Sequence, residues 1–415
     1  MSRPILRGVV ACFLGALALA ACSSGAPPSS ARQLTLGTLL PKTGSSASLG
    51  GPESAGVAVA LQEINDAGGV LDHPVDVVEG DSGDATSNVA SQTVDRELAG
   101  GVDAIVGASS DAVTLEVIDK VAAAGVVMIS PANTSGVLSG YANAHGLFFR
   151  TSPPDSVQGQ VLGKLIATDE HQRLAVLAVR DPYAAALSDR VVAAFKAGGG
   201  VEATRVDYDP AGTEIASAVA HAVASVPDAV LVIGFDEASK VVTELVARGI
   251  GPDRISLYLA DGALSDKVAE GLPPGTLSGT KGTRPGNALP AAFRARLQAV
   301  NPDLTEFGYA AQSYDAVILL ALAAQAAGTS DGTALAATLP VVSRGGVKCT
   351  TFATCRDLLK AGQDIDYDGQ SGPVDFGADG DPAKASIGIY RFGSDDRYNP
   401  VPIDVVALDV PPATR

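Results

Sequence analysis

The sequence of 415 residues predicts an α/β fold built from two doubly wound, Rossmann-like lobes. Short apolar runs such as VDAIVG (102–107) and GVVMISP (125–131) are typical of buried parallel strands. The stretch between them, 113–124, carries apolar residues at the spacing of one helix face. This alternation occurs both before and after GLFFRTSPPD (146–155), and the chain is long enough for two full cores.

The first series begins after residue 32. Strands are expected at Gln33–Leu40, in VDVVEGD (75–81), in 102–107 and in 125–131. Helices are expected around 57–64, where Gly68-Gly69 ends the pattern, at Asp84–Leu98 and at 113–124. The loop PKTGSSASLGGPES (41–54) is too long for a simple turn and is suited to lining a site.

The second series follows the proline pair 153–154, which should end a strand, and Asp155 is expected to cap the next helix. Strands are predicted in RLAVLAVRD (173–181), VEATRVDYD (201–209), DAVLVIGF (228–235) and ISLYLADG (255–262). Helices are predicted at Tyr183–Ala197, Thr213–Ser225, Asp236–Arg248, Leu289–Val300 and Phe307–Ala327. The segment Ile365–Val410 is irregular and strand-like.

The first 21 residues have the features of an export signal: Arg3, Arg7 and an apolar run, 9–20, too short to span a membrane. The run ends in LAAC (19–22), which resembles the bacterial lipobox and implies cleavage before Cys22 and a diacylglyceryl group on its sulfur. Residues 22–32 would then be a lipidated tether, since they hold no core-forming residues. The protein is expected outside the cell's cytoplasmic membrane, anchored to its outer face.

The net charge of −17 argues against nucleic acid as a partner and against broad binding to anionic lipid.

Cys349 and Cys355 are an even pair in an exported chain, so a structural disulfide is expected. A metal or redox role is disfavoured because the four histidines are scattered and the spacing is not CxxC. No catalytic set and no cofactor motif is visible, so the expected protein is a binder without cofactor and not an enzyme.

Two predicted strands of the first lobe end in loops of small polar residues. Ser109-Ser110-Asp111 follows one strand, and Ala132-Asn133-Thr134 follows the next. Ligands of open α/β sheets lie outside the carboxyl ends of the strands. These loops, one of which leads into a helix N-terminus, are therefore predicted to cradle a small polar or anionic group.

The chain resembles the type 1 periplasmic binding proteins of ABC importers, in particular the branched-chain amino acid (Leu/Ile/Val) group. The pieces that carry the resemblance span nearly the whole mature chain in the family's order: LPKTGSSASLGGPESAGVAVALQEINDAGGV (40–70), VDAIVG (102–107), GVVMISPANTS (125–135), FFRTSPPDSVQG (148–159), VLVIGF (230–235), YLADG (258–262), FGYAAQSYDAV (307–317) and IDYDGQSGPVDF (365–376).

The resemblance implies two lobes joined by a three-crossover hinge, with residues 33–150 plus 283–375 in lobe 1 and 151–282 plus 376–415 in lobe 2. Closure of the hinge would trap a small ligand, an amino acid or amide, for delivery by a monomer to membrane-bound permease subunits. The same fold used as a ligand sensor for a signalling partner, without transport, is the alternative.

The resemblance also assigns roles to residues. It places the contacts to a ligand α-carboxylate at Ser110 or Asp111 and at Ala132, Asn133 and Thr134, and the partner of the ligand ammonium at Asp261. It places the walls of the pocket at Leu49, Tyr183, Phe235 and Tyr309. Asp261 could instead be a turn residue beside Gly262.

Asp111 departs from the family, which often has serine there. A carboxylate at this position would repel a ligand carboxylate ~4 Å away by roughly 1 kcal/mol in water and more in a closed cleft. Either Asp111 caps its helix and faces away, leaving Ser109 and Ser110 as donors, or the ligand is not a simple amino acid.

One segment matches a calcium motif in part. Asp364, Asp366, Asp368, Gly369 and Asp375 occupy EF-hand positions 1, 3, 5, 6 and 12. Aspartate in place of glutamate at position 12 and Pro373 inside the loop disfavour Ca²⁺. The resemblance offers another role, a packing segment.

Overall fold

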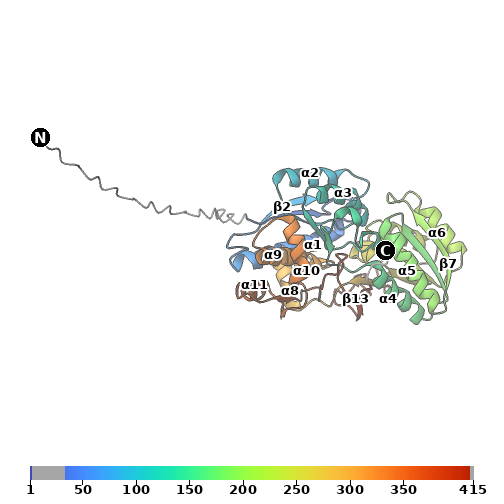
Figure 1. The fold of residues 1–415 in the computed structure, drawn as a ribbon. Coiled ribbons are helices and arrows are strands. Elements are labelled where there is room, and N and C mark those ends of the chain that lie inside the picture. The colour runs from blue at the N-terminus through green and yellow to red at the C-terminus, as the bar shows by residue number, and fades with distance from the viewer. Residues whose placement is uncertain (2–32, 412–415) are drawn as a thin grey trace.

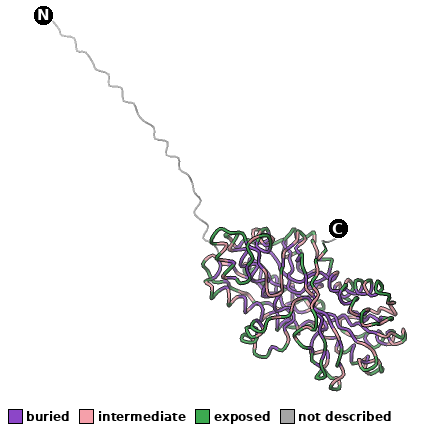
Figure 2. The backbone as a smooth tube through the Cα atoms, turned by 90° about the horizontal axis from the view of Figure 1, so that it is seen from below, coloured by how far each residue is buried: buried purple, intermediate pink, exposed green. Residues whose placement is uncertain are grey.

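The computed structural model describes residue 1 and residues 33–411. Apart from its first residue, the predicted signal peptide lies outside the described residues, as do Cys22 and the tether. The described chain forms two lobes side by side, each with its own twisted sheet and buried core (Figures 1 and 2).

The first lobe has a five-stranded parallel sheet in the order β2-β1-β3-β4-β5. Its strands are β1 (Thr35–Leu40), β2 (Asp76–Asp81), β3 (Ala104–Gly107), β4 (Val127–Ser130) and β5 (Phe148–Arg150). The central strands β3 and β4 are buried at every position, which explains their continuous apolar sequence. Their carboxyl ends face the second lobe and place the loops at 108–111 and 131–135 there.

Seven α-helices pack around this sheet: α1 (Ala47–Asp66), α2 (Val89–Gly100), α3 (Asp111–Ala123), α8 (Ala291–Val300), α9 (Ala310–Ala327), α10 (Gly332–Val342) and α11 (Phe352–Lys360). Among the described residues, α9 alone is long and apolar enough to cross a membrane. Because 83% of that helix is buried inside the lobe, it is a core helix. It packs against α1 and α10.

The second lobe has a seven-stranded sheet in the order β14-β13-β10-β9-β8-β6-β7. Its strands are β6 (Arg173–Val179), β7 (Val201–Tyr208), β8 (Ala229–Ile233), β9 (Ser256–Leu259), β10 (Lys281–Pro285), β13 (Lys384–Arg391) and β14 (Asp404–Asp409). The strands from β6 to β10 are parallel, and β13 runs antiparallel to both of its neighbours. The helices are α4 (Asp155–Thr168), α5 (Pro182–Ala197), α6 (Ile215–Ala224) and α7 (Ala238–Ala247).

The chain passes between the lobes three times. It enters the second lobe after β5, returns after β10, and crosses again between Phe376, which lies in the first core, and β13. The boundary expected at residue 283 lies inside β10, because that strand pairs with β9 on one side and through Pro285 with β13 on the other.

The local structure differs from the sequence analysis in two places. Asp155 does not cap α4: Pro154 is the N-cap residue, and Asp155 is the first residue of the helix. The extended backbone of Pro154 starts the helix one residue earlier than expected, and the Asp155 N–H donates to the Thr134 carbonyl (2.7 Å). The helices α10 and α11 also lay in a part of the sequence for which no element was predicted.

The predicted disulfide is confirmed. Cys349 and Cys355 are bonded, with a Cα–Cα distance of 5.4 Å, and join β11 (Val347–Cys349) to α11. β11 pairs with β12 (Ile365–Tyr367) in a small separate sheet.

The calcium motif does not form a binding loop. Its second to fourth residues form β12 (Ile365–Tyr367), Asp366 and Asp368 both pair with Lys348 (3.0 and 2.9 Å), and Asp375 pairs with Lys384 (3.5 Å). Across residues 33–411 no group of three or more His, Cys, Asp or Glu side chains is arranged to hold a metal ion.

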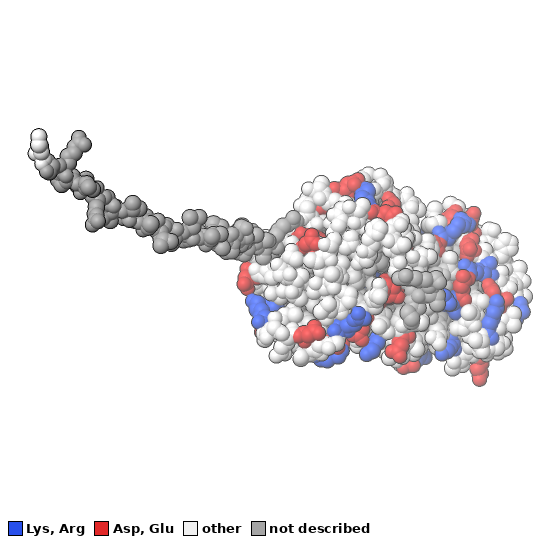
Figure 3. Space-filling view, viewed as in Figure 1, with Lys and Arg blue, Asp and Glu red and all other residues white. Residues whose placement is uncertain are grey.

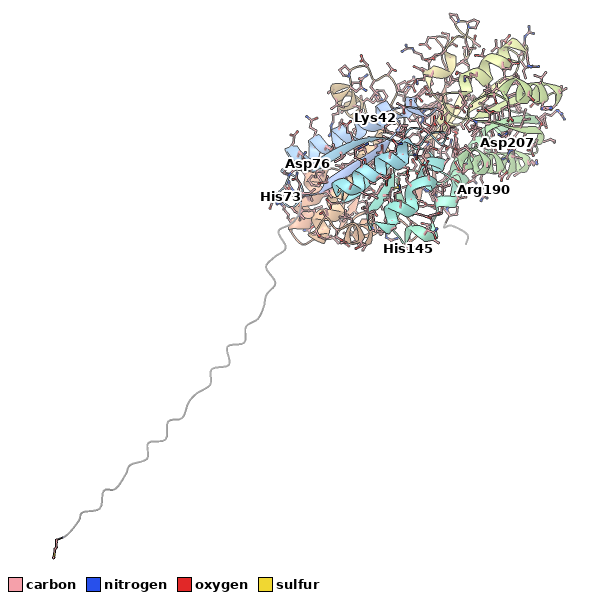
Figure 4. The ribbon with its side chains drawn as sticks, turned by 90° about the horizontal axis from the view of Figure 1, so that it is seen from above. Lys42, His73, Asp76, His145, Arg190 and Asp207 are labelled. Atoms are coloured by element: carbon pink, nitrogen blue, oxygen red, sulfur yellow. A yellow bond between two sulfur atoms is a disulfide. The ribbon has the colours of Figure 1, made fainter. Side chains whose placement is uncertain are left out.

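Acidic and basic side chains are interspersed over the visible face of both lobes (Figure 3). Two of the histidines, His73 and His145, are exposed and far apart on the first lobe (Figure 4). The visible surface therefore has no broad basic face of the kind that binds nucleic acid.

Candidate ligand-binding site

A small pocket lies between the lobes, at the carboxyl ends of the strands. It is lined by Leu49, Ser109, Ser110, Asp111, Ala132, Thr134, Tyr183, Phe235, Asp261, Gly262 and Tyr309. Every residue predicted for the site except Asn133 lines this pocket, and Gly262 adds to the set. A larger hollow of about 270 Å³ lies at the hinge, around Thr151 and Lys384, away from these loops.

The hydroxyl oxygens of both serines in the first loop, Ser109 and Ser110, already take part in hydrogen bonds within the protein. Ser110 is the N-cap of α3, and its hydroxyl oxygen accepts the Val113 N–H (3.4 Å). The Ser109 hydroxyl lies 2.5 Å from a carboxylate oxygen of Glu53, a fully buried residue of α1. Burial raises the pKa of Glu53 to about 8, and the Ser109 hydrogen bond opposes that shift. Ser110 keeps its O–H free for a partner in the pocket.

Asp111 does not cap its helix, so that alternative was wrong. Ser110 takes the cap position, and Asp111 is the first residue of α3 and lines the pocket. One oxygen, Oδ2, accepts the Ser135 N–H (3.2 Å), while Oδ1 has no hydrogen-bond partner among the described residues. Burial raises the pKa of Asp111 to about 7; the Asp181 carboxylate adds to the shift and Arg150 opposes it.

Asn133 lies behind the pocket and ties the two loops together. Its Nδ2 donates to the Ser109 carbonyl (3.0 Å), and its Oδ1 accepts the Thr114 hydroxyl (2.7 Å). The side chain is fully buried. Asn133 was predicted to contact the ligand. Its side-chain amide instead makes hydrogen bonds to Ser109 and Thr114, and the residue does not line the pocket.

Asp261 follows β9 and opens a short 3₁₀ turn, Asp261–Ala263. Its Oδ1 accepts the Tyr183 hydroxyl (2.7 Å) and the Gln158 amide (2.8 Å), and its Oδ2 accepts the Tyr309 hydroxyl. These partners are side chains from three other elements, so Asp261 is not simply a turn residue. Burial, followed by the charge of Asp261, raises the pKa of both tyrosines well above the usual value, which keeps them protonated donors.

Aromatic and aliphatic side chains form the remaining walls. The Tyr183 and Phe235 rings lie 5.6 Å apart between centroids, and Tyr309 packs with Leu49 and Ala132. Arg284 lies behind Tyr309, 6.0 Å from its ring centroid. It donates to the main-chain oxygens of Asp261 and Leu264 and to the Tyr398 hydroxyl, and not to the Asp261 carboxylate.

A buried ionic group lies beside the pocket at the first hinge segment. Arg150 is fully buried and donates to Asp381 at 2.6 and 2.9 Å. Neither oxygen of the buried Asp155 carboxylate accepts a hydrogen bond of good geometry in the described chain, although the Thr134 hydroxyl is close enough to oppose its pKa shift. Burial, with Asp111 and Asp261 nearby, raises the pKa of Asp155 well above its usual value.

The lobes touch around the pocket, which closes it. The Asp236 N–H of the second lobe donates to the Ser45 carbonyl of the first (2.9 Å). Glu306 of the first lobe accepts the Asp266 N–H (2.7 Å) and the Ser265 hydroxyl (3.1 Å) of the second.

Sequence reasoning missed Glu53, Gln158, Arg284 and Glu306. No local motif marks them, because each acts through a partner far away in the chain.

A protein-family model described as "Periplasmic binding protein" matches residues 33–395. The chemotactic signal transduction system substrate-binding protein BasB of Halobacterium salinarum is 30% identical over 361 residues, covering 83% of this chain and 84% of that protein. The Leu/Ile/Val-binding protein homolog 1 of Brucella suis is 26% identical over 386 residues, covering 88% of this chain and 92% of that protein.

Solved structures share the fold. The leucine binding protein LivK from Thermotoga maritima has a TM-score of 0.73 at 19% identity and covers 90% of this chain and 98% of its own. LivJ from Streptococcus pneumoniae, in complex with isoleucine, has a TM-score of 0.73 at 20% identity, with coverage of 91% and 100%. A solute binding protein of an ABC transporter from R. palustris, in complex with benzoate, has a TM-score of 0.70 at 18% identity, with coverage of 92% and 98%.

Proposed function

The chain belongs to the periplasmic binding protein family, a non-enzymatic family of extracytoplasmic proteins, and from this we propose that it is a solute-binding lipoprotein of an ABC importer. It captures a small amphipathic ligand, an amino acid or an amide, between its two lobes and delivers it to the permease. The relatives named Leu/Ile/Val-binding proteins and the structure with isoleucine support this ligand class.

One geometric fact supports the proposal most directly: Ser109, Ser110 and Thr134 of the first-lobe loops line the same small pocket as Asp261 of the second lobe. A ligand with polar groups at two points would contact both lobes only when the lobes are together. Binding would therefore stabilise the closed form by the difference in affinity between closed and open states. Tyr183, Phe235 and Tyr309 would cover its apolar part.

The resemblance to BasB supports one alternative. By its printed name that protein serves a chemotactic signal transduction system. In a sensor of this kind, ligand capture is unchanged and the closed form is recognised by a signalling partner. Uptake of labelled ligand by cells that lack the chain separates the two roles: uptake is lost if the chain serves an importer and is retained if it serves only a sensor.

The lipid anchor is part of the proposal and rests on LAAC at 19–22. Replacing Cys22 with serine should release the mature chain from membranes, as seen by fractionation, and the mass of the mature N-terminus should show the acyl chains. A chain that remains membrane-bound after this change would remove the anchor from the proposal.

A thermal-shift screen tests ligand capture. The panel contains amino acids, amides, polyamines and aromatic acids. A ligand at 100 times its Kd stabilises the folded protein by about 2.7 kcal/mol, so a true ligand gives a clear shift. If no class of compound shifts the transition, the solute-binding proposal fails.

A further inference from the structure

The pocket contains a carboxylate of its own at the place where the family likeness puts the carboxylate of the ligand. Asp111 lies at the start of α3, in the loop that was predicted to cradle an anion. Its Oδ2 accepts the Ser135 N–H (3.2 Å). A backbone donor and a helix N-terminus that could have held a ligand carboxylate are thus used by the protein itself.

The other oxygen of Asp111 needs a donor. Asp111 is only 2% exposed, it lines the pocket, and its Oδ1 accepts no hydrogen bond of good geometry in the described chain, although the Thr134 N–H is close enough to oppose the shift of its pKa. A buried carboxylate oxygen without a donor is unfavourable, and a donor from a bound molecule would relieve this cost. The free oxygen therefore points to a ligand that brings an N–H group to the first lobe.

The cationic side chains near the pocket, Arg150 and Arg284, do not donate a hydrogen bond to Oδ1 of Asp111. Arg150 donates to Asp381, to the Ser139 hydroxyl and to the Ser135 carbonyl. Arg284 is bound to main-chain oxygens and to Tyr398. None of the side chains that line the described pocket is Lys, Arg or His. A ligand carboxylate would find no cation in the wall and would face Asp111.

The walls suit an organic cation. Tyr183, Phe235 and Tyr309 present three aromatic rings to this pocket, and the faces of such rings attract ammonium groups. Asp261 does not provide the free acceptor, because its carboxylate already receives Gln158, Tyr183 and Tyr309. The acceptor with an open oxygen is Asp111.

We propose that the ligand is a small organic ammonium ion without a carboxylate, and that Asp111 binds its ammonium group and excludes amino acids and carboxylic acids. This inference rests on the proposed solute-binding function and replaces its ligand class, amino acids and amides, with amines. It separates this chain from the structures solved with isoleucine and benzoate, whose ligands carry a carboxylate.

Calorimetry with matched probes tests the head group. One set shares an isobutyl tail: 3-methylbutylamine, leucine and 4-methylpentanoate. A second shares a benzyl tail: 2-phenylethylamine, phenylalanine and 3-phenylpropanoate. In at least one set the amine should bind the mature chain at least tenfold more tightly than the amino acid, and the acid should not bind. An amino acid or acid that binds as tightly as its amine, or a failure of both amines to bind, overturns the inference.

Two variants test the role of Asp111. Asp111→Ser should weaken the amine at least tenfold and improve the amino acid, and Asp111→Asn should weaken the amine while keeping the shape of the side chain. Glu116→Gln, at an exposed position on the same helix, is the control and should leave both affinities unchanged. Unchanged amine affinity in both Asp111 variants, with melting curves that show them folded, also overturns the inference.

The two proposals can fail separately. If leucine binds and the amines do not, the solute-binding function stands and only the ammonium inference falls. If no compound of the thermal-shift panel binds, both fall.

Discussion

The hydroxyl of Tyr309, at the start of α9 in the first lobe, donates a hydrogen bond to the carboxylate of Asp261 in the second lobe. Both residues are buried and both line the pocket. Their contact crosses the cleft, so it exists only when the lobes are closed. It therefore ties the closed arrangement of the lobes to two residues that line the pocket.

Removing this contact should favour the open form. In Tyr309→Phe a hydrogen bond to a charged acceptor is lost, which costs about 1.5–3 kcal/mol in the closed state. Affinity for a ligand found in the screen should fall roughly tenfold or more, and small-angle scattering should show a larger radius of gyration. Tyr314→Phe is the control, because Tyr314 is on the same helix and donates to Glu63 within the first lobe (2.7 Å). Equal effects of both changes would contradict a special role for the cross-lobe contact.

The charge of Asp261 should also matter. Asp261→Asn keeps the shape of the side chain but weakens three hydrogen bonds to a charged group, so ligand binding should weaken by about 1.5–3 kcal/mol. Calorimetry measures this. The exposed second-lobe Asp253 supplies the control variant, Asp253→Asn. Unchanged affinity in Asp261→Asn would remove Asp261 from the site.

Glu53 should make the ligand-free protein less stable at high pH. Burial raises its pKa from 4.5 to about 8, so between these values the folded chain keeps a proton that the unfolded chain has lost. The free energy of unfolding should therefore fall with rising pH in this window, by up to about 1.4 kcal/mol per pH unit for this group, and level off above pH 8. Urea unfolding at pH 5, 7 and 9 measures it. Glu53→Gln should reduce the slope; a slope that does not change would show that Glu53 is not its source.

Binding of an amine should depend on pH through Asp111. Its pKa is raised to about 7 by burial and then by the Asp181 charge, with Arg150 and the backbone N–H groups of Ser135 and Thr134 opposing. An ammonium ligand favours the ionised form, so affinity for 3-methylbutylamine or 2-phenylethylamine should fall roughly tenfold per pH unit below 7 and level off above it. Calorimetry in buffers of different ionisation enthalpy should detect proton release near pH 6–7. Asp111→Asn should remove both effects, and an amine affinity that does not vary between pH 6 and 8 would contradict the assignment.

The disulfide should contribute modestly, because it closes a short loop. Cys349 and Cys355 are six residues apart. The chain-entropy relation gives roughly 2 kcal/mol for a loop of this size. Replacing both cysteines with serine should lower the free energy of unfolding by about that amount, and a reducing agent should destabilise the parent chain but not the variant. A loss several times larger would mean that the bond does more than restrict the unfolded chain.

Much of the fold could be predicted from the sequence. Buried parallel strands are continuous apolar runs, and the helices between them carry apolar residues at helical spacing, so the order of the elements was predictable. The loops after β3 and β4 were identified as the site because parallel strands direct their carboxyl ends to one edge, and the family resemblance added the loop after β9. The pocket is lined by those loops.

The errors have a common origin. Asn133 was assigned to the ligand, but its amide binds Ser109 and Thr114. Asp155 was assigned to a helix cap, but Pro154 takes that position. Polar residues in a loop can turn toward the ligand or toward the protein, and their sequence neighbours do not decide which.

The sequence by itself determined the alternation of strands and helices, the disulfide pair and the two first-lobe loops at the cleft, because hydrophobic period and strand direction are local properties. The second-lobe residues of the cleft came from the resemblance to a family. Only the tertiary structure decided the direction of each polar side chain. Asp111 turns toward Ser135, and Asp261 receives donors from α4, from α5 and from Tyr309 at the start of α9. Those partners come from distant parts of the chain, and a buried carboxylate takes its direction from whichever donors packing brings within reach.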